Sequence, residues 1–177
     1  MRLAYKLLAL LVAIMCVTYT QAQVVPDFTP NTFSACPPAT IIFTNTSTGS
    51  AKSFSWTFGN GNSSNFIDAS TIYDRPGIFN VTLTAVDGAG VSTSVSKQIT
   101  IYKLPKVNFN VSAQRICERE NVQFTDASTA GSGPLKTWLW DFGDGYTSPQ
   151  KSAIHQYTNS SFYTIKLFVT DTFGCSW

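Results

Sequence analysis

One aromatic, glycine-rich segment occurs twice in this sequence. Residues 54–61 read FSWTFGNG, and residues 138–145, 84 positions later, read WLWDFGDG. Repeated segments of this kind are normally built alike, so we expect two copies of one module rather than a single merged core. The repeat therefore favours an architecture of two similar domains.

The two copies can be aligned along most of their length. Cys36 and Phe43 recur 81 positions later as Cys117 and Phe124, whereas positions further along recur after 84. The change in spacing marks a short insertion around residues 131–135, which are rich in Gly, Ser and Pro. Such an insertion is typical of a surface loop, because loops change length at little cost.

The first 22 residues have the pattern of a cleavable signal peptide. A positively charged start is followed by an apolar run over residues 7–17 and by small residues at 20–22. The apolar run is shorter than the roughly 20 residues that span a bilayer, so we expect no transmembrane segment. A lipoprotein signal ending at Cys16 is the alternative, which the bulky Met15 disfavours. We predict export to the cell surface or the medium.

The net charge gives no support for nucleic acid or an anionic membrane as a partner. The sequence has 12 Lys and Arg against 10 Asp and Glu, and cleavage after residue 22 would remove Arg2 and Lys6. The remaining charge is then about zero, and the basic residues are scattered. Attraction to polyanions needs an excess of positive charge, so these partners are not expected.

Both copies show the alternation of half-buried β-strands. Residues 79–85 alternate apolar and polar side chains, and residues 163–169 repeat the pattern before a glycine-containing turn. No stretch has a convincing helical period. With a tryptophan on an early strand of each copy, the pattern predicts an all-β chain of two tandem immunoglobulin-like β-sandwiches.

We expect the two domains at residues 23–103 and 104–177, joined by a short segment that Pro105 keeps extended. The second copy lacks a counterpart of the strand at residues 91–101, which would start near Cys175. A sandwich without its last strand exposes an unpaired edge. We therefore expect the N-terminal part of a longer protein, whose other domains are the first partners.

The second copy resembles the PKD domain, the immunoglobulin-like module first described in polycystic kidney disease protein. Residues 140–145 (WDFGDG) match its hallmark, and residues 155–157 (HQY) resemble its H-x-Y segment. The first copy departs from the hallmark at Thr57 and Asn60, and has Thr71 in place of the histidine. The resemblance implies tandem PKD domains, as in large secreted or surface proteins of Gram-negative bacteria. Such modules serve as spacers, adhesive units or enzyme appendages, so no ligand is implied.

The hallmark residues are interpreted as structural. Trp56 and Trp140 lie mid-strand, where we expect core anchors that each bury on the order of 200 Å², rather than sugar-stacking platforms. The glycines that follow permit a tight hairpin. The predicted core residues are Trp56, Phe58, Tyr73, Trp140, Phe142 and Tyr157, and the predicted hairpin residues are Gly59, Gly61, Gly143 and Gly145.

Asp141 and Asp144 are weak candidates for calcium ligands, because two carboxylates three residues apart offer hard oxygen atoms. The first copy keeps the glycines of this turn but has neither carboxylate. We therefore favour carboxylates that accept main-chain N–H groups of the turn, and predict no metal and no cofactor.

Cys117 and Cys175 bracket the second copy, and their placement resembles cysteines of tandem PKD repeats in secreted surface proteins. We predict a disulfide between them, which would close about 58 residues and stabilise the domain by roughly 4 kcal/mol. Val91 stands where Cys175 would have its counterpart in the first copy. Cys36 is therefore expected to be unpaired or to meet a partner outside the sequence.

His155 is the single histidine of the sequence, and we interpret it as a packing residue, not a catalytic or zinc-binding one. Better candidates for a binding surface are Tyr146, Phe168 and Trp177. The first hypothesis is a non-catalytic, exported spacer that also makes weak contacts with a surface protein or polysaccharide. The alternative is the accessory PKD region of a secreted protease or glycoside hydrolase, whose catalytic domain lies outside this sequence.

Overall fold

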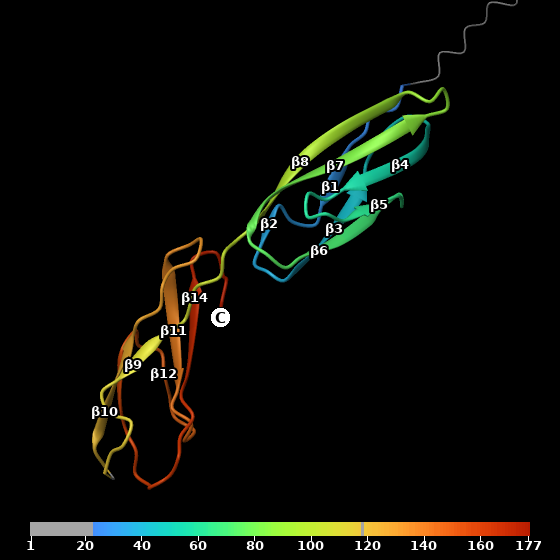
Figure 1. Cartoon of the computed structure of the whole chain (residues 1–177). Coiled ribbons are helices and arrows are strands. Elements are labelled where there is room, and N and C mark those ends of the chain that lie inside the picture. Colours follow the sequence, from blue (N-terminus) through green and yellow to red (C-terminus); the bar gives the residue numbers. More distant parts are fainter. Residues whose placement is uncertain (1–22, 118) are drawn as a thin grey trace, which may run out of the picture.

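Two β-sandwiches lie end to end along an extended molecule (Figure 1). The structure, a computed structural model, describes residues 23–117 and 119–177, so the predicted signal peptide at residues 1–22 lies outside the described residues. Every regular element in the described ranges is a β-strand, which confirms the all-β prediction. Within the same ranges there is accordingly no helix of the length and hydrophobicity needed to cross a membrane.

The first domain packs a three-stranded sheet of order β1-β3-β6 against a five-stranded sheet of order β2-β8-β7-β4-β5. Its pairs are antiparallel except for β2, which joins β8 in parallel. The strands are β1 (Phe28–Pro30), β2 (Ser34–Ala35), β3 (Ala39–Asn45), β4 (Ala51–Thr57), β5 (Ser63–Ser64), β6 (Ala69–Tyr73), β7 (Gly77–Asp87) and β8 (Ser92–Ile101).

The second domain repeats this plan with fewer strands. Its sheets have the orders β13-β10-β9 and β12-β11-β14. Among the described residues of the second domain, no strand corresponds to β2 or β8 of the first. The strands are β9 (Phe109–Val111), β10 (Asn121–Asp126), β11 (Leu135–Asp141), β12 (Thr147–Ser148), β13 (Ala153–Gln156) and β14 (Lys166–Asp171).

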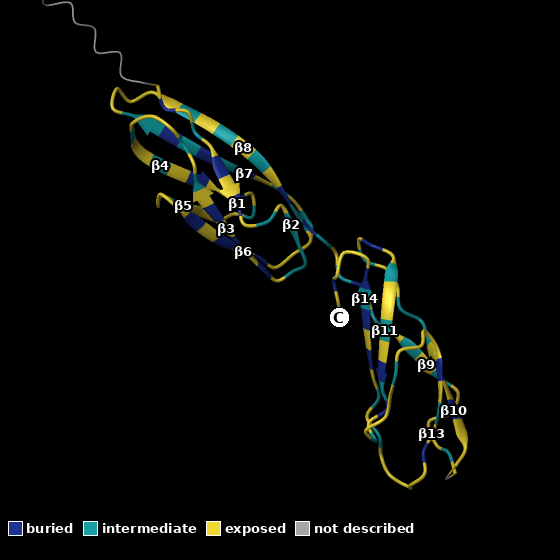
Figure 2. Cartoon of the chain, turned by 180° about the vertical axis from the view of Figure 1, so that it is seen from behind, coloured by how far each residue is buried: buried dark blue, intermediate teal, exposed yellow. Residues whose placement is uncertain are grey.

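Each sandwich has its own core, built on one tryptophan. Alternate residues of the strands point inward, so buried and exposed positions alternate along both domains (Figure 2). Trp56 packs edge-on against Phe28 with ring centroids 5.2 Å apart, and Trp140 packs in the same way against Phe109, also at 5.2 Å. Each indole N–H donates to a main-chain carbonyl, at 2.9 and 2.8 Å. All six side chains predicted for the core are buried, in two separate clusters.

One buried tyrosine in each domain ties its two sheets together. The hydroxyl of Tyr73 donates to the carbonyl of Phe58 at 2.8 Å, and that of Tyr157 donates to the carbonyl of Phe142 at 3.1 Å. Burial raises the pKa of Tyr73 to about 12. Burial also raises the pKa of Tyr157 to about 12, with smaller contributions from the charges of Asp144 and Tyr163. Both hydroxyls therefore stay protonated donors well above neutral pH.

The hairpin after each tryptophan has the backbone that its glycines were expected to provide. Gly59 and Gly143 have φ angles of +75° and +79°. A Cβ atom would lie 2.9 Å from the carbonyl oxygen of Asn80 at Gly59, and 2.6 Å from that of Thr164 at Gly143. A side chain is thus excluded by both the backbone angle and the neighbouring chain. The other two predicted hairpin glycines, Gly61 and Gly145, also have positive φ.

Candidate functional site at the domain junction

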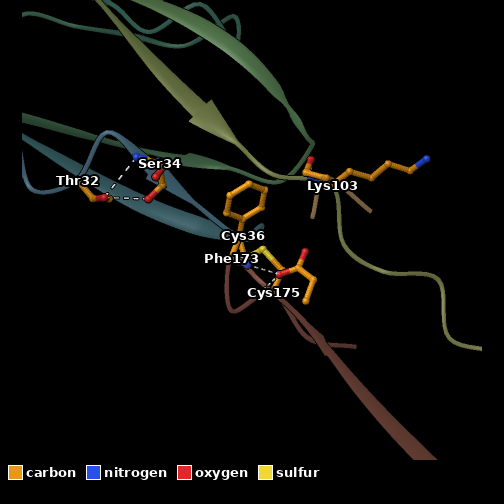
Figure 3. Close-up of a disulfide and its surroundings, with 8 residues drawn as sticks. Thr32, Ser34, Cys36, Lys103, Phe173 and Cys175 are labelled. Atoms are coloured by element: carbon orange, nitrogen blue, oxygen red, sulfur yellow. Dashed lines mark hydrogen bonds between the residues drawn. A yellow bond between two sulfur atoms is a disulfide. The ribbon is translucent and has the colours of Figure 1, made fainter. Parts of the chain in front are cut away.

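A disulfide between Cys36 and Cys175 closes the junction between the two domains (Figure 3). Their Cα atoms are 5.4 Å apart, although 139 positions separate them in sequence. Cys36 follows β2, and Cys175 lies in the turn after β14. The predicted bridge between Cys117 and Cys175 is therefore wrong, as is the expectation that Cys36 has no partner within this sequence.

The head-to-tail order of the domains explains this correction. Cys36 and Cys117 hold equivalent positions, shortly before β3 in the first domain and shortly before β10 in the second. In the first domain this position faces the junction. In the second domain the segment that leads into β10 lies at the end away from the junction (Figure 1). Cys117 is consequently exposed and forms no disulfide with the cysteines that the structure describes.

The turn that carries Cys175 is held by a buried carboxylate. Asp171 is 1% exposed, and its Oδ1 atom accepts hydrogen bonds from the main-chain N–H groups of Phe173 and Cys175, each at 2.9 Å. In the first domain Asp87 makes the same two bonds, and there the position of Cys175 is occupied by Val91. One turn geometry thus presents an apolar side chain in the first domain and a bridging sulfur in the second.

An aromatic stack lies beside the disulfide. The rings of Tyr102, just after β8, and Phe173 are 4.1 Å apart between centroids and only 4° from parallel. The main-chain N–H of Tyr102 donates to the carbonyl of Ala35 at 2.9 Å, so the tyrosine is fixed to the first domain. Phe173 belongs to the same turn as Cys175. The stack therefore connects the two domains through side chains, next to their covalent connection.

The insertion of the second copy holds the linker. Lys103 donates its main-chain N–H to Ser132 Oγ at 2.8 Å, and the Ser132 N–H donates to the Lys103 carbonyl at 2.9 Å. A Cβ atom on Gly131 would lie 2.0 Å from that carbonyl oxygen, and one on Gly133 would lie 2.8 Å from the Phe173 ring. These glycines let the loop approach the linker and the aromatic stack closely, so the predicted surface loop is part of the junction.

Two sequence signals could have revealed this junction. The insertion occurs only in the copy that follows a linker, where a docking loop is useful. The cysteines also fit a head-to-tail arrangement, because the first domain has a cysteine only at the end facing the second domain. Pairing between copies joins the two cysteines at the ends that face each other, Cys36 and Cys175, and leaves over Cys117 at the far end.

The hairpin carboxylates, the weak calcium candidates, stabilise their own turn. Asp141 Oδ1 accepts the N–H of Gly143 at 2.9 Å, and Asp144 Oδ1 accepts the N–H of Tyr146 at 3.2 Å. Among residues 23–117 and 119–177, no group of three or more His, Cys, Asp or Glu side chains is placed to hold a metal ion. The two aspartates therefore act as acceptors that stabilise the hairpin turn.

His155 is committed to a structural pair in the second domain. Its Nε2 atom lies 2.7 Å from Asp144 Oδ2, and its ring stacks on Phe142 with centroids 4.2 Å apart. Burial raises the pKa of Asp144, but hydrogen bonds from His155 and from the N–H of Tyr146, with the histidine charge, together lower it below the ordinary value. In the first domain the equivalent positions hold two neutral residues, Asn60 and Thr71, whose side chains are hydrogen-bonded.

The three candidates for a binding surface come from separate elements. Tyr146 lies in the hairpin, with its ring 5.7 Å from that of His155. Phe168 lies on the outer face of β14, and Trp177 pairs with Val169 at the edge of the same strand. All three side chains are exposed.

Two tandem immunoglobulin-like sandwiches, each with a buried tryptophan followed by a double-glycine hairpin, define the class of this protein. The chain belongs to the PKD domain family, which it matches over residues 25–101 and again over residues 103–177. The resemblance noted in the hallmark segment is thereby confirmed.

Several bacterial proteases contain regions similar to this chain. Collagenase ColA of Clostridium perfringens is 34% identical over 86 residues, which cover 48% of this chain and 8% of that protein. Collagenase ColQ1 of Bacillus cereus is 37% identical over 73 residues, covering 41% of this chain and 8% of that protein. Pre-pro-metalloprotease PrtV of Vibrio cholerae is 30% identical over 82 residues, covering 46% and 8%. The matched regions thus span less than a tenth of these relatives.

Solved structures of single PKD domains are also similar to parts of this chain. The PKD1 domain of Vibrio anguillarum Epp is 25% identical with a TM-score of 0.41, covering 46% of this chain and 95% of that domain. The PKD1 domain of the Vibrio cholerae metalloprotease PrtV is 28% identical with a TM-score of 0.40, covering 45% and 98%.

Proposed function

We propose that the two PKD domains form a rigid, non-catalytic spacer in the accessory region of a larger exported protein. The observation that carries the proposal is the junction, where a disulfide, an aromatic stack and a pinned linker act together. A linker with free main-chain groups would let the domains swing, whereas here Lys103 exchanges hydrogen bonds with Ser132 and Lys106 exchanges main-chain hydrogen bonds with Thr129. The pair therefore holds a fixed length and direction between whatever it connects.

The accessory role is supported by the relatives. The similar regions are small parts of proteins named as collagenases and metalloproteases, so the same modules occur beside catalytic domains. A non-catalytic role is supported by His155, the single histidine, whose ring is taken up by Asp144 and Phe142. In this proposal any catalysis belongs to other domains, and this pair sets their spacing.

Export is supported by the disulfide, because such bonds persist in oxidising compartments and are rare in the cytosol. The N-terminal pattern of residues 1–22 agrees with this location. Export also gives the bridge a purpose, because a spacer outside the cell meets shear and proteases without chaperones.

Small-angle X-ray scattering of residues 23–177 in the oxidised form tests the spacer proposal. The expected profile fits one extended arrangement of the two domains, while the variant with Cys36→Ser and Cys175→Ser needs a broader distribution of domain angles. If the oxidised protein itself requires a broad distribution, the spacer proposal is wrong.

Adhesion is the competing role, and a binding assay separates the two. Sedimentation with insoluble collagen, cellulose and chitin is expected to leave the protein in the supernatant. Retention that is lost in Tyr146→Ala or Phe168→Ala, with folding unchanged, would replace the spacer role by direct binding through these exposed rings.

A further inference from the structure

The hairpin of the first domain contains the one Asn-Gly dipeptide of the sequence, Asn60 followed by Gly61. The second hairpin has Asp144 followed by Gly145 at the equivalent place. An asparagine before a glycine is especially prone to deamidation, because the glycine has no side chain to hinder the attack of its nitrogen on the asparagine amide. The first domain thus carries a labile amide where the second carries the acid that deamidation produces.

The main chain is open to solvent at this dipeptide. Gly61 is exposed and has a φ angle of +92°. Among the described residues, no atom lies within 4 Å of the place that its Cβ atom would take. Beside the hairpin is a recess of about 340 Å³, lined in part by Asn60, Asp74 and Arg75. Water therefore has access to both groups that would react, the side chain of Asn60 and the main-chain nitrogen of Gly61.

Three hydrogen bonds hold the Asn60 amide in the folded domain. Its Nδ2 atom donates to Thr71 Oγ1 at 3.2 Å and to the carbonyl of Ile72 at 3.0 Å. Its Oδ1 atom accepts the main-chain N–H of Asn62 at 3.1 Å. Thr71 and Ile72 belong to β6, an edge strand of the three-stranded sheet. Departure of Nδ2 breaks both bonds that it donates, so the folded contacts oppose deamidation.

We propose that Asn60 is a deamidation site that becomes reactive when the hairpin separates from β6. In the open state the main-chain nitrogen of Gly61 attacks Asn60 Cγ. The new C–N bond closes a succinimide ring, the bond between Cγ and Nδ2 breaks, and Nδ2 leaves as ammonia with the proton of the Gly61 N–H. Water then opens the ring at either carbonyl and leaves aspartate or isoaspartate at position 60. Water is the single co-reactant, and nothing is oxidised or reduced.

The product cannot restore the contacts that protected the amide. A carboxylate has no N–H to donate to the carbonyl of Ile72, and the two facing oxygen atoms repel each other. The second domain accommodates an acid here because His155 lies 2.7 Å from Asp144, whereas the first domain has Thr71 in place of the histidine. Deamidation therefore loosens β6 irreversibly, and only in the first domain. The inference does not depend on the spacer role, because it concerns one hairpin.

Ageing of the oxidised protein in mildly alkaline buffer tests the site. Peptide mapping by mass spectrometry detects the exchange of NH2 for OH, and an isoaspartate assay detects the second product. Asn60 should deamidate faster than Asn62, which precedes serine in the same hairpin. It should also react about tenfold or more slowly in the folded protein than in the same protein in urea. Thr71→Val removes one acceptor of Nδ2, so the folded rate should rise by about threefold or more.

Equal rates at Asn60 and Asn62 would overturn the site. Equal rates in buffer and in urea, or an unchanged rate in Thr71→Val, would overturn its control by β6.

Thermal unfolding of the aged protein tests the consequence. The Tm of the first domain should fall by about 4 °C or more, as it should in freshly prepared Asn60→Asp. Gly61→Ala hinders ring closure, so its Tm should stay at the starting value on ageing. Asp144→Asn is the matched control in the other hairpin. Deamidation there restores the native acid in part of the molecules, so the Tm of the second domain should rise. A fall in both domains, or none in the first, would overturn the proposed loosening.

Discussion

Tyr102 and Phe173 stack almost parallel, with 4.1 Å between ring centroids, although they belong to different domains. The stack is set by two local features: the hydrogen bond that fixes Tyr102 to Ala35, and the Asp171 turn that presents Phe173. The disulfide between Cys36 and Cys175 lies beside it. The domain interface is therefore constrained by packing and by a covalent bond, and these constraints can be removed one at a time.

The disulfide should shield most of the chain from mechanical force. When the protein is pulled from residues 23 and 177, the tension passes through the bridge, and the 139-residue span between the cysteines stays off the force path. Single-molecule force spectroscopy should show little extension of the oxidised protein. Reduction, or Cys36→Ser with Cys175→Ser, should release about 470 Å of additional contour length, at about 3.4 Å per residue.

The outcome for the oxidised protein decides this prediction. Two unfolding events of full domain length without reductant would mean that the bridge does not carry the load. Cys117→Ser serves as the matched control, since removal of an exposed thiol away from the junction should leave the force trace unchanged.

Gly131→Ala should disturb the junction without unfolding either domain. A Cβ atom at this position would lie 2.0 Å from the Lys103 carbonyl oxygen, so the linker must move away from the loop and lose its hydrogen bonds to Ser132. We expect a wider distribution of domain angles by X-ray scattering and a loss of about 1–3 kcal/mol in the free energy of unfolding.

Gly145→Ala is the control for this variant. It lies in the hairpin at φ +92° with no atom within 4 Å of the added Cβ, so it should cost about 1 kcal/mol through backbone strain alone. The domain angles should then be unchanged. If both alanine variants give the same scattering profile, the loop does not hold the linker.

The Asp144 and His155 pair should make the second domain sensitive to acid. The pKa of Asp144 is lowered in the folded protein, so its contribution to stability is present above the unfolded pKa of about 4 and disappears as pH falls through the lower folded value. Chemical denaturation between pH 6 and pH 2 measures this slope. It should be smaller in Asp144→Asn.

The neutral pair of the first domain suggests a rescue. Asn60 donates its side-chain N–H to Thr71 Oγ1 at 3.2 Å, in the place of the Asp144–His155 pair. Asp144→Asn alone should lose about 1–2 kcal/mol, and adding His155→Thr should recover part of this loss. Strict additivity of the two changes would show that the side chains do not interact.

The two buried tyrosines should make the protein labile in strong alkali. Tyr73 and Tyr157 both have a folded pKa raised to about 12 by burial, against about 10 when unfolded. Their contribution is complete below pH about 10 and is lost as pH rises to about 12. Absorbance titration of tyrosinate should show a late component that shrinks in Tyr73→Phe and in Tyr157→Phe. Titration of all tyrosines near pH 10 would contradict this prediction.

Local sequence was sufficient for most elements of the two domains. An exception is residues 163–165, which share the predicted alternation but lie outside β14, which begins at Lys166. The alternation along residues 79–85, the mid-strand position of Trp56 and the glycines of the hairpin depend on neighbours a few residues away, and each appears in the structure as expected. Such features follow from strand geometry and from backbone angles that only glycine adopts readily. For the same reason, the repeat correctly predicts two separate cores.

The junction could not be derived in the same way. Cys36 meets Cys175, and Gly131 meets Lys103, only because one domain stacks on the other with a particular end and rotation. Periodicity and spacing describe each strand within its own sheet and carry no information about that rigid-body placement. Strand periodicity is therefore enough to predict two tryptophan-centred sandwiches, whereas the pairing of the cysteines depends on how the domains pack, because a disulfide requires two Cα atoms within a few ångströms, whatever their separation along the chain.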